Sequence, residues 1–347
     1  MTSAPTVVIG SAGRRLYLID WFREALAALV PGGQVVVTEN DPTSSSATYG
    51  DIARTMPRYT DPEYAPALLE LVDEFAPRIF LSVNDYELMH LHVHTDLAGR
   101  LHERGVLVPG VSAAWQLLCA DKLLMARALA EEGIRTPVTV TGGDVDGIAG
   151  LGSAASEVVV KHRLGSGSSG LAVVPIAQAS AAVADAVRTA PSQGGGLPGV
   201  DDVVVQPRLA GIEHGVDVVA DLRRPGILRG VLARRKLRMR SGETDKAVTV
   251  DPAPFRDAAE RLARASGLTG LVDVDMFLED DGSVSVIDVN PRFGGGYPFV
   301  HLAGADVPRS YVAQAFDLVE DPAWLECTHG TVGAKYESVR VTGRVTS

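Results

Sequence analysis

The chain has 347 residues, of which 46% are hydrophobic and 22% charged, the composition of an ordinary globular protein with room for two or three packed units. Its formal net charge of −11 argues against non-specific binding to nucleic acid or to an anionic membrane surface. No apolar run is long enough to span a bilayer, and the N-terminus lacks a signal-peptide pattern. Cys119 and Cys327 are too few for a disulfide framework or a zinc site, so we expect a cytoplasmic protein without nucleic-acid or membrane partners.

Strands and helices alternate in the first third of the chain. Runs of β-branched and other apolar residues predict strands at 6–9, 34–38 and 78–83. Apolar residues at helical spacing predict helices at 16–29, 64–75 and 87–104. This alternation indicates βαβ units and a parallel sheet, so we expect a doubly wound α/β domain here.

The pattern changes from about Ser112 onward. A helix over 112–132, broken near Asp121, is followed by segments in which strands dominate. Two of these strands are separated by the turn Glu279-Asp280-Asp281-Gly282, which favours a hairpin. One helix and a strand-like stretch near 336–341 are expected after Ser310. The other predicted helices are 177–188 and 255–266, and the predicted strands are 158–161, 203–206, 215–220, 227–233, 246–250, 271–278 and 284–289.

Acidic residues in the last two of these strands suggest a metal site. Residues two apart in a strand share a face, so Asp288, Asn290 and Arg292 project together, and hairpin pairing would place Asp273 or Asp275 opposite Asp288. Two carboxylates, an amide oxygen and a nearby arginine suit Mg²⁺ and phosphate. The alternative is a set of solvated polar positions, but the apolar neighbours indicate a packed sheet, where acids need partners.

A lysine precedes a glycine-rich turn after the strand at 158–161. Lys161 is followed by Gly165-Ser166-Gly167-Ser168-Ser169-Gly170, whose backbone N–H groups could close over phosphate oxygens. No Gly-Lys-Ser/Thr follows, so this is not a Walker A loop. Taken alone, the segment fits a flexible hairpin loop equally well.

The most basic stretch of the chain runs from Arg234 to Arg240. In an extended segment its alternation places Lys236, Arg238 and Arg240 on one side. A solvated charge run is the usual explanation of such a stretch, but binding an anionic substrate or phosphate fits this acidic protein better than nucleic-acid contact.

Three other kinds of site find little support. Of His90, His92 and His94, only the first and last share a helical face, and no third ligand completes a metal site. A serine hydrolase lacks its Gly-x-Ser-x-Gly elbow. The turn Gly10–Arg14 lacks the third glycine of a dinucleotide fingerprint, although Asp41 lies near where a ribose-binding acid would be, so a dehydrogenase is a weaker alternative.

The order of these features resembles that of ATP-grasp enzymes, in the branch similar to the carbamoyl-phosphate synthetase large subunit and the pyrrolysine-biosynthesis ligase. The resemblance covers nearly the whole chain. It is most specific at Val286-Ile287-Asp288-Val289-Asn290-Pro291-Arg292-Phe293-Gly294-Gly295-Gly296-Tyr297-Pro298, which looks like that branch's magnesium-and-phosphate signature. It implies an α/β and α+β fold with a Rossmann-like pre-ATP-grasp domain at 1–111 and an ATP-grasp domain at 112–347. The latter would contain a small mobile lid at about 138–207 and a large antiparallel-sheet subdomain at 208–347.

The resemblance also implies ATP and two Mg²⁺ ions as cofactors and assigns roles to residues of this chain. The implied ATP-binding residues are Lys122, Lys161, Ser166, Gly167, Gln206, Arg208, Leu209 and Glu213. The implied metal ligands are Asp275, Asp288 and Asn290, and the implied catalytic residues are Arg292 and Arg240. Pro207 departs from the family pattern, in which a glutamate often accepts from the adenine amino group. Asp275 and Asp288 stand where relatives often carry Gln and Glu.

The substrate site is expected at the carboxyl ends of the first strands, where open α/β sheets bind ligands. This rule and the resemblance together select Gly13, Arg14, Asp85, Glu87, Arg238, Glu243, Gly294 and Gly295. Paired cations and acids suit a zwitterion, so an amino acid is the preferred substrate.

We therefore expect a carboxylate–amine ligase that forms an amide or peptide bond through an acyl phosphate, with small-molecule carboxylate and amine substrates. The open alternatives are an ATP-grasp carboxylase, a kinase-type phosphoryl transfer and a non-catalytic nucleotide-binding module. A homodimer is an option that the sequence does not fix.

Overall fold

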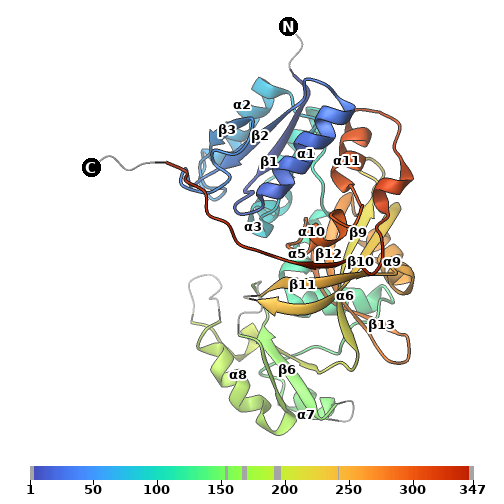
Figure 1. The fold of residues 1–347 in the computed structure, drawn as a ribbon. Helices are drawn as coiled ribbons and strands as arrows, with labels where there is room; N and C mark the ends of the chain where they lie inside the picture. The colour runs from blue at the N-terminus through green and yellow to red at the C-terminus, as the bar shows by residue number, and fades with distance from the viewer. Residues whose placement is uncertain (1–3, 153–154, 166–169, 191–196, 241, 344–347) are drawn as a thin grey trace.

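The computed structural model (Figure 1) describes residues 4–152, 155–165, 170–190, 197–240 and 242–343. The strands within these ranges form three sheets. One is parallel and belongs to the first third of the chain, and the other two are antiparallel. The predicted α/β and α+β fold class is therefore confirmed.

The first sheet has the strand order β3-β2-β1-β4, with all its pairs parallel. Helices α1 (Leu16–Leu29) and α2 (Tyr64–Phe75) begin and end where the apolar periodicity predicts. The strands are β1 (Thr6–Gly10), β2 (Gln34–Glu39), β3 (Ile52–Thr55) and β4 (Ile79–Ser82). The sequence prediction missed β3, an edge strand of four residues without a buried side chain.

The single helix predicted over 87–104 is wrong, because three short helices occupy this region. They are α3 (Asp85–Met89), a π-helix η1 (His90–His94) and α4 (Leu97–Glu103). Asn84 caps α3 by accepting hydrogen bonds from the backbone N–H groups of Tyr86 and Glu87. Among the residues that the structure describes, no three His, Cys, Asp or Glu side chains gather as a metal site.

His92 gives the π-helix a pH dependence. Burial lowers the pKa of His92 from 6.5 to about 4, so the unfolded chain binds a proton that the folded chain does not. Stability from this histidine is fully present above pH 6.5 and is lost as the pH falls from 6.5 towards 4, by up to about 1.4 kcal/mol per pH unit. Urea unfolding at several pH values should therefore show that the free energy of unfolding falls less steeply between pH 6.5 and 4 in His92→Leu than in the wild type. An equally steep fall of the free energy of unfolding in both proteins would contradict a buried, neutral His92.

The second sheet, with the order β5-β8-β6-β7, is built from the segment predicted as the lid. Helix α8 (Ala179–Val187) packs on it with the apolar residues Ala182, Val183 and Ala186. Its strands are β5 (Val140–Thr141), β6 (Glu157–His162), β7 (Ala172–Pro175) and β8 (Val203–Pro207), and α7 (Val145–Leu151) completes it. The short elements β5, β7 and α7 were not predicted.

The third sheet, with the order β13-β12-β9-β10-β11-β14, is the largest. Its strands are β9 (Ile212–Ala220), β10 (Leu228–Arg240), β11 (Glu243–Val250), β12 (Gly270–Leu278), β13 (Val284–Asn290) and β14 (Val332–Ala334). The helices around it are α5 (Ala113–Ala120), α6 (Lys122–Glu131), α9 (Arg256–Ser266), α10 (Tyr297–His301) and α11 (Val307–Ala315). The strand expected at 336–341 is wrong, because these residues are irregular and the last strand of the described residues is β14.

One apolar core joins the first sheet to the large sheet. Val7 and Ile9 of β1 belong to the same buried cluster as Val219 of β9 and Leu271 of β12, with α1 and α11 between them. The lid has a separate core. Each sheet lies inside one of the three predicted segments, and their limits 1–111, 138–207 and 208–347 stay a prediction. No helix in the described ranges is long and apolar enough to cross a membrane.

Candidate active site

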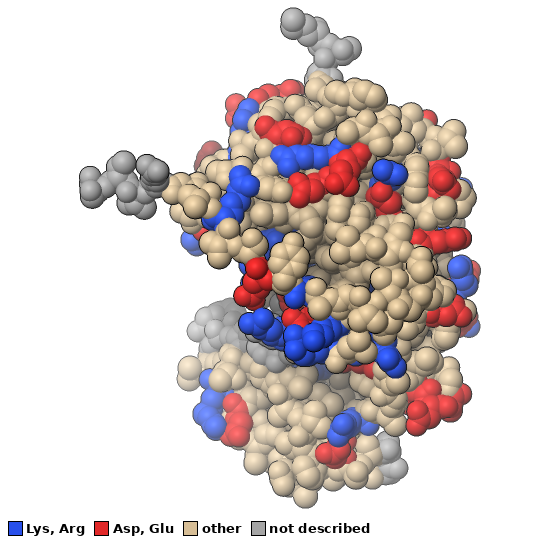
Figure 2. Space-filling model, viewed as in Figure 1, with Lys and Arg blue, Asp and Glu red and all other residues tan. Residues whose placement is uncertain are grey.

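A cavity of about 890 Å³ lies where the first sheet, the lid and the large sheet meet. Its size is that of a pocket for a ligand of several hundred daltons. In Figure 2, lysine and arginine side chains gather around the hollow between the lid and the rest of the molecule. The lining includes the turns after β1 and β4, namely residues 11–15 and 83–86, which lie at the same edge because their strands are parallel neighbours.

The hairpin of β12 and β13 forms one wall of the cavity. Asp275 lies opposite Asp288, which is one of the two pairings expected from the sequence, and Asp273 lies opposite Asn290 instead. Asp275, Asp288 and Asn290 all line the cavity. Two carboxylates and an amide oxygen form a hard-oxygen donor set of the kind that holds Mg²⁺ together with substrate phosphates.

Lys236 connects two of the predicted ligand-binding acids. Its Nζ donates to Glu213 Oε1 at 2.5 Å and to Asp275 Oδ1 at 2.6 Å. Burial raises the pKa of Asp275, and the charge of Lys236 opposes that rise. Lys236 therefore holds a proposed ribose-binding acid and a proposed metal ligand in a fixed relation.

Lys122 and Lys161 approach the cavity from two directions. Lys122 begins α6, and its Nζ donates to the carbonyl O of Gly165 at 2.6 Å, at the start of the glycine-rich turn. Lys161 is buried on β6. Burial lowers the pKa of Lys161, while the nearby charge of Asp288 raises it. The bond of Lys122 is to a neutral group, so its positive charge stays available for an anion.

Arg292 lies between the predicted metal ligands and the turn after β4. Its Nη2 donates to Asp85 Oδ2 at 2.9 Å and to Asn290 Oδ1 at 3.3 Å. Burial lowers the pKa of Arg292, but the charges of Asp85 and Asp273 outweigh burial and raise it. The guanidinium is therefore oriented from both sides before any substrate binds.

The basic stretch does not present its cations on one face, and this expectation was wrong. Strand β10 has register irregularities between Lys236 and Arg238 and between Arg238 and Met239, which break the alternation. Lys236 and Met239 line the cavity, whereas Arg238 pairs with Asp245 outside it. Arg240, expected to be catalytic, pairs with Glu337 at 3.7 Å and does not line the cavity.

The predicted adenine hinge lies beside this cavity rather than in its lining. Gln206 is buried and donates to Thr139 Oγ1 at 2.7 Å, and Arg208 donates to Glu157 Oε2 at 2.6 Å. Leu209 does not line the cavity either. Ser166 and Gly167, expected to contact ATP phosphates, lie outside the described residues.

Some of the predicted substrate residues line the cavity and others do not. The lining includes Gly13, Arg14, Asp85, Glu243 and Gly295.

Glu87 and Gly294 are absent from that lining. Glu87 is buried beneath the β1 turn, where it accepts hydrogen bonds from Tyr64 Oη at 2.6 Å and Ser82 Oγ at 2.5 Å. Burial raises the pKa of Glu87. Gly294 packs directly against Asp273, where a Cβ would lie 2.1 Å from a carboxylate oxygen.

The sequence assigned no role to three cavity residues whose neighbours come from other strands or turns. Arg234 is buried, and its guanidinium donates to Asp217 Oδ2 at 2.5 Å and to Asp273 Oδ1 at 2.6 Å. The others are Lys236 and Arg15, which donates to the carbonyl O of Val83 at 2.8 Å. The basic composition of 234–240 marked the first two as candidates, but only the fold separates the inward from the outward side chains.

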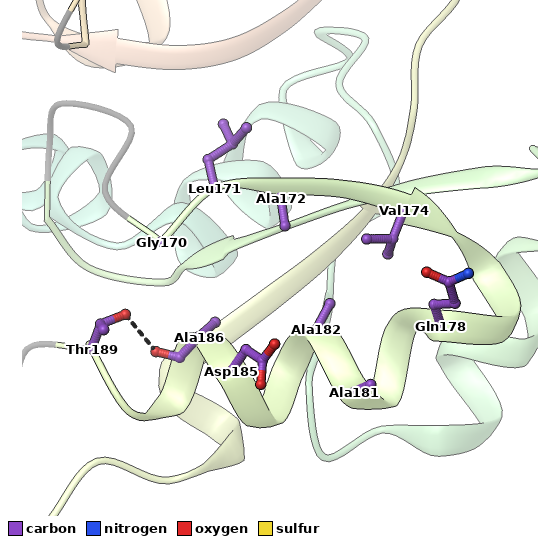
Figure 3. Close-up of a pocket in the computed structure, with 10 residues that line it drawn as sticks. All are labelled: Gly170, Leu171, Ala172, Val174, Gln178, Ala181, Ala182, Asp185, Ala186 and Thr189. Atoms are coloured by element: carbon purple, nitrogen blue, oxygen red, sulfur yellow. Dashed lines mark hydrogen bonds between the residues drawn. The ribbon is translucent and has the colours of Figure 1, made fainter.

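A smaller cavity of about 520 Å³ lies in the lid between β7 and α8 (Figure 3). Thr189 donates to the carbonyl O of Ala186 at 3.2 Å along its edge. Asp185 is the one charged side chain among its ten lining residues. The larger cavity, with its acids and cations, is therefore the better candidate for the reaction.

Comparison with known families agrees with this geometry. A model of the ATP-grasp domain matches residues 119–296, more than half of the chain. The chain belongs to the ATP-grasp family. A model of the PylC-like N-terminal domain matches residues 7–106. The protein is accordingly an ATP-dependent ligase with ATP and Mg²⁺ as its cofactors.

Solved structures show the same ATP-grasp architecture over most of the chain. The biotin carboxylase domain of 2-oxoglutarate carboxylase from Hydrogenobacter thermophilus, with MgADP and bicarbonate, has a TM-score of 0.68 at 16% identity, covering 91% of this chain and 70% of that one. L-amino acid ligase from Bacillus licheniformis has a TM-score of 0.66 at 16% identity, covering 94% and 78%. N5-carboxyaminoimidazole synthetase from Staphylococcus aureus has a TM-score of 0.65 at 13% identity, covering 93% and 80%. These identities show the fold alone, and a search of curated proteins found no significant match.

Proposed function

We propose that this ATP-grasp protein joins a carboxylate to an amine through an acyl phosphate, with an amino acid as one substrate. The main supporting observation is the position of Arg292. It contacts Asn290 of the proposed metal site and Asp85 of the first-domain turn, so one guanidinium faces both the phosphate end and the substrate end of the cavity. The fold similarity to an L-amino acid ligase is consistent with this chemistry.

The residues in the cavity fit each part of the reaction. The substrate carboxylate would take the terminal phosphoryl group of ATP, and ADP would leave with the electron pair of the broken P–O bond. The amine nitrogen would then bond to the acyl carbon, phosphate would leave with the C–O electron pair, and the amine proton would pass to solvent. Lys122, Lys161 and Arg292 would neutralise the charge that develops on the phosphoryl oxygens. Mg²⁺ bound at Asp275, Asp288 and Asn290 would supply further charge neutralisation.

ADP release tests the proposal directly. The wild type, incubated with ATP, Mg²⁺ and pooled amino acids, should release ADP and form an amide. A variant carrying Asp288→Ala and Asn290→Ala should lose about 100-fold or more of this activity, because it lacks two of the three proposed metal ligands. Asp280→Ala, in the exposed turn of the same hairpin, is the matched control and should keep wild-type activity.

The alternatives give different products in the same assay. ADP release that needs bicarbonate and yields no amide would favour a carboxylase, the activity named for the similar biotin carboxylase domain. A phosphorylated product without an amide would favour a kinase-type transfer. Tight ATP binding without ADP release from any pool would favour a non-catalytic module. Either a monomer or a homodimer is compatible with the proposal, and sedimentation would distinguish them.

A further inference from the structure

A lysine near the end of the described chain lies beside Glu243, a residue that lines the cavity. Lys335 follows β14, and its backbone N–H donates to the carbonyl O of Asp245 at 2.8 Å. Its Nζ donates to Glu243 Oε2, also at 2.8 Å. Because β14 pairs with β11, the strand that begins at Glu243, the lysine and the glutamate are held on the same edge of the sheet.

The segment that carries Lys335 is also fixed at its other end. After leaving β14 it passes to the first domain, as the red trace in Figure 1 shows. There Arg340 donates to the carbonyl O of Thr48 at 3.1 Å, and its guanidinium lies 4.7 Å from the centre of the Tyr49 ring. Lys335 is thus part of a segment attached both to the large sheet and to the first domain.

Glu243 is surrounded by more positive charge than it can neutralise. Arg14 Nη2 lies 4.0 Å from Glu243 Oε1, and Lys335 pairs with the other oxygen. Burial raises the pKa of Glu243, but Lys335, Arg15 and Arg14 together lower it overall. Arg15 itself bonds to the neutral carbonyl of Val83. Three cations therefore share one carboxylate, which leaves an excess of positive charge in a protein whose net charge is −11.

This excess lies beside the loop that follows Arg292. A Cβ at Gly295 would lie 3.2 Å from Glu243 Oε2 and 3.3 Å from Lys335 Nζ, so the pair abuts the lining of the cavity. The proposed phosphate cations Lys122 and Lys161 come from other elements, α6 and β6. The cavity thus has one group of cations beside the metal ligands and a second group between the β1 turn and β11.

We propose that Arg14, Arg15 and Lys335 form a binding site for a substrate carboxylate that does not react, so that the amine substrate is itself an amino acid. This inference rests on the proposed ligase function. Glu243 positions Lys335 and Arg14, and the amino group of the substrate is left to face Arg292 and the acyl phosphate. A charge-assisted contact of this kind discriminates strongly between a carboxylate and its neutral carboxamide.

The test compares an amino acid with its carboxamide as the amine substrate in the ADP-release assay, with a saturating amount of the carboxylate substrate that the pooled assay identifies. Lys335→Met should raise the KM for the amino acid about tenfold or more and leave the KM for the carboxamide, the kcat and the KM for ATP nearly unchanged. Lys335→Arg should restore most of the amino-acid affinity. Arg54→Met, which removes a surface ion pair on the first domain (Arg54 to Glu74, 2.7 Å), should change none of these constants.

Two outcomes would overturn the inference. One is an equal change of both KM values in Lys335→Met, and the other is a lower KM, which would mean that Lys335 competes with the substrate. A wild type that releases no ADP with any amino acid would instead refute the proposed function. In that case, calorimetry with amino acids, Mg²⁺ and a non-hydrolysable ATP analogue tests the carboxylate-binding site alone. The site is refuted if no amino acid binds, or if Lys335→Met binds amino acids as tightly as the wild type.

Discussion

Arg292→Ala is expected to lower ATP-dependent turnover about 10³-fold while ATP binding stays nearly unchanged. The guanidinium is largely buried and already oriented by Asp85 and Asn290, so it offers a fixed charge where the phosphoryl oxygens would lie. Loss of one pre-oriented donor to a developing negative charge typically costs this much in kcat. Single-turnover ADP release gives the rate, and calorimetry with a non-hydrolysable ATP analogue gives the affinity.

Two further variants separate charge from geometry. Arg292→Lys keeps the charge but cannot hold Asp85 and Asn290 with one planar group, so we expect an intermediate rate. Arg229→Ala removes an arginine that pairs with Glu320 at 2.6 Å, a contact outside the lining of the cavity, and should leave the rate unchanged. Nearly wild-type turnover in Arg292→Ala, or a loss of ATP affinity that equals the loss of rate, would contradict the assigned role.

Gly296→Ala is expected to lower the free energy of unfolding by about 3 kcal/mol or more. A Cβ at this position would lie 2.2 Å from Arg234 Nε, which no real contact allows. The guanidinium cannot move aside cheaply, because Asp217 and Asp273 bind it in a fully buried place. Relief of the clash would therefore break a buried ion pair. Urea unfolding followed by circular dichroism measures the change.

The neighbouring glycine provides the matched control. At Gly295 an added Cβ meets only the ends of the Glu243 and Lys335 side chains, at 3.2 and 3.3 Å, and both can shift. We therefore expect Gly295→Ala to change the free energy of unfolding by less than about 1 kcal/mol. Equal stabilities of the two alanine variants would show that Arg234 has room to move, contrary to its two short ion pairs.

The sequence predicted those parts of the fold in which the local pattern and the tertiary environment agree. Helices α1 and α2 have strong apolar periodicity and a single buried face, so their limits were predicted to the residue. The β12–β13 hairpin was predicted from its turn and its alternation, and with it the approach of Asp275 to Asp288. The ATP-grasp family itself was predicted from the order of the motifs and is confirmed.

Features that depend on irregular backbone or on distant partners were not predictable in this way. Because of the register irregularities in β10, Lys236 lines the cavity and Arg238 does not. No residue type in 234–240 indicates these irregularities. The π-helix His90–His94 replaces what periodicity shows as continuous helix. Lys335 became a candidate only because the large sheet brings it next to Glu243, 92 positions earlier in the sequence.

The core shared by α1, α11 and the large sheet has a consequence for how this chain can vary. Residues 1–111 contain a complete parallel sheet, yet one side of α1 is covered by residues that come some 290 positions later, such as Tyr311 and Val312. Cut off after residue 111, this segment would expose that apolar face to water and would tend to aggregate. Replacement of the segment by that of a relative would require matching changes on α11. The first domain therefore cannot evolve as an independent module, whereas the segment 138–207, which has a core of its own, can vary more independently of the rest of the chain.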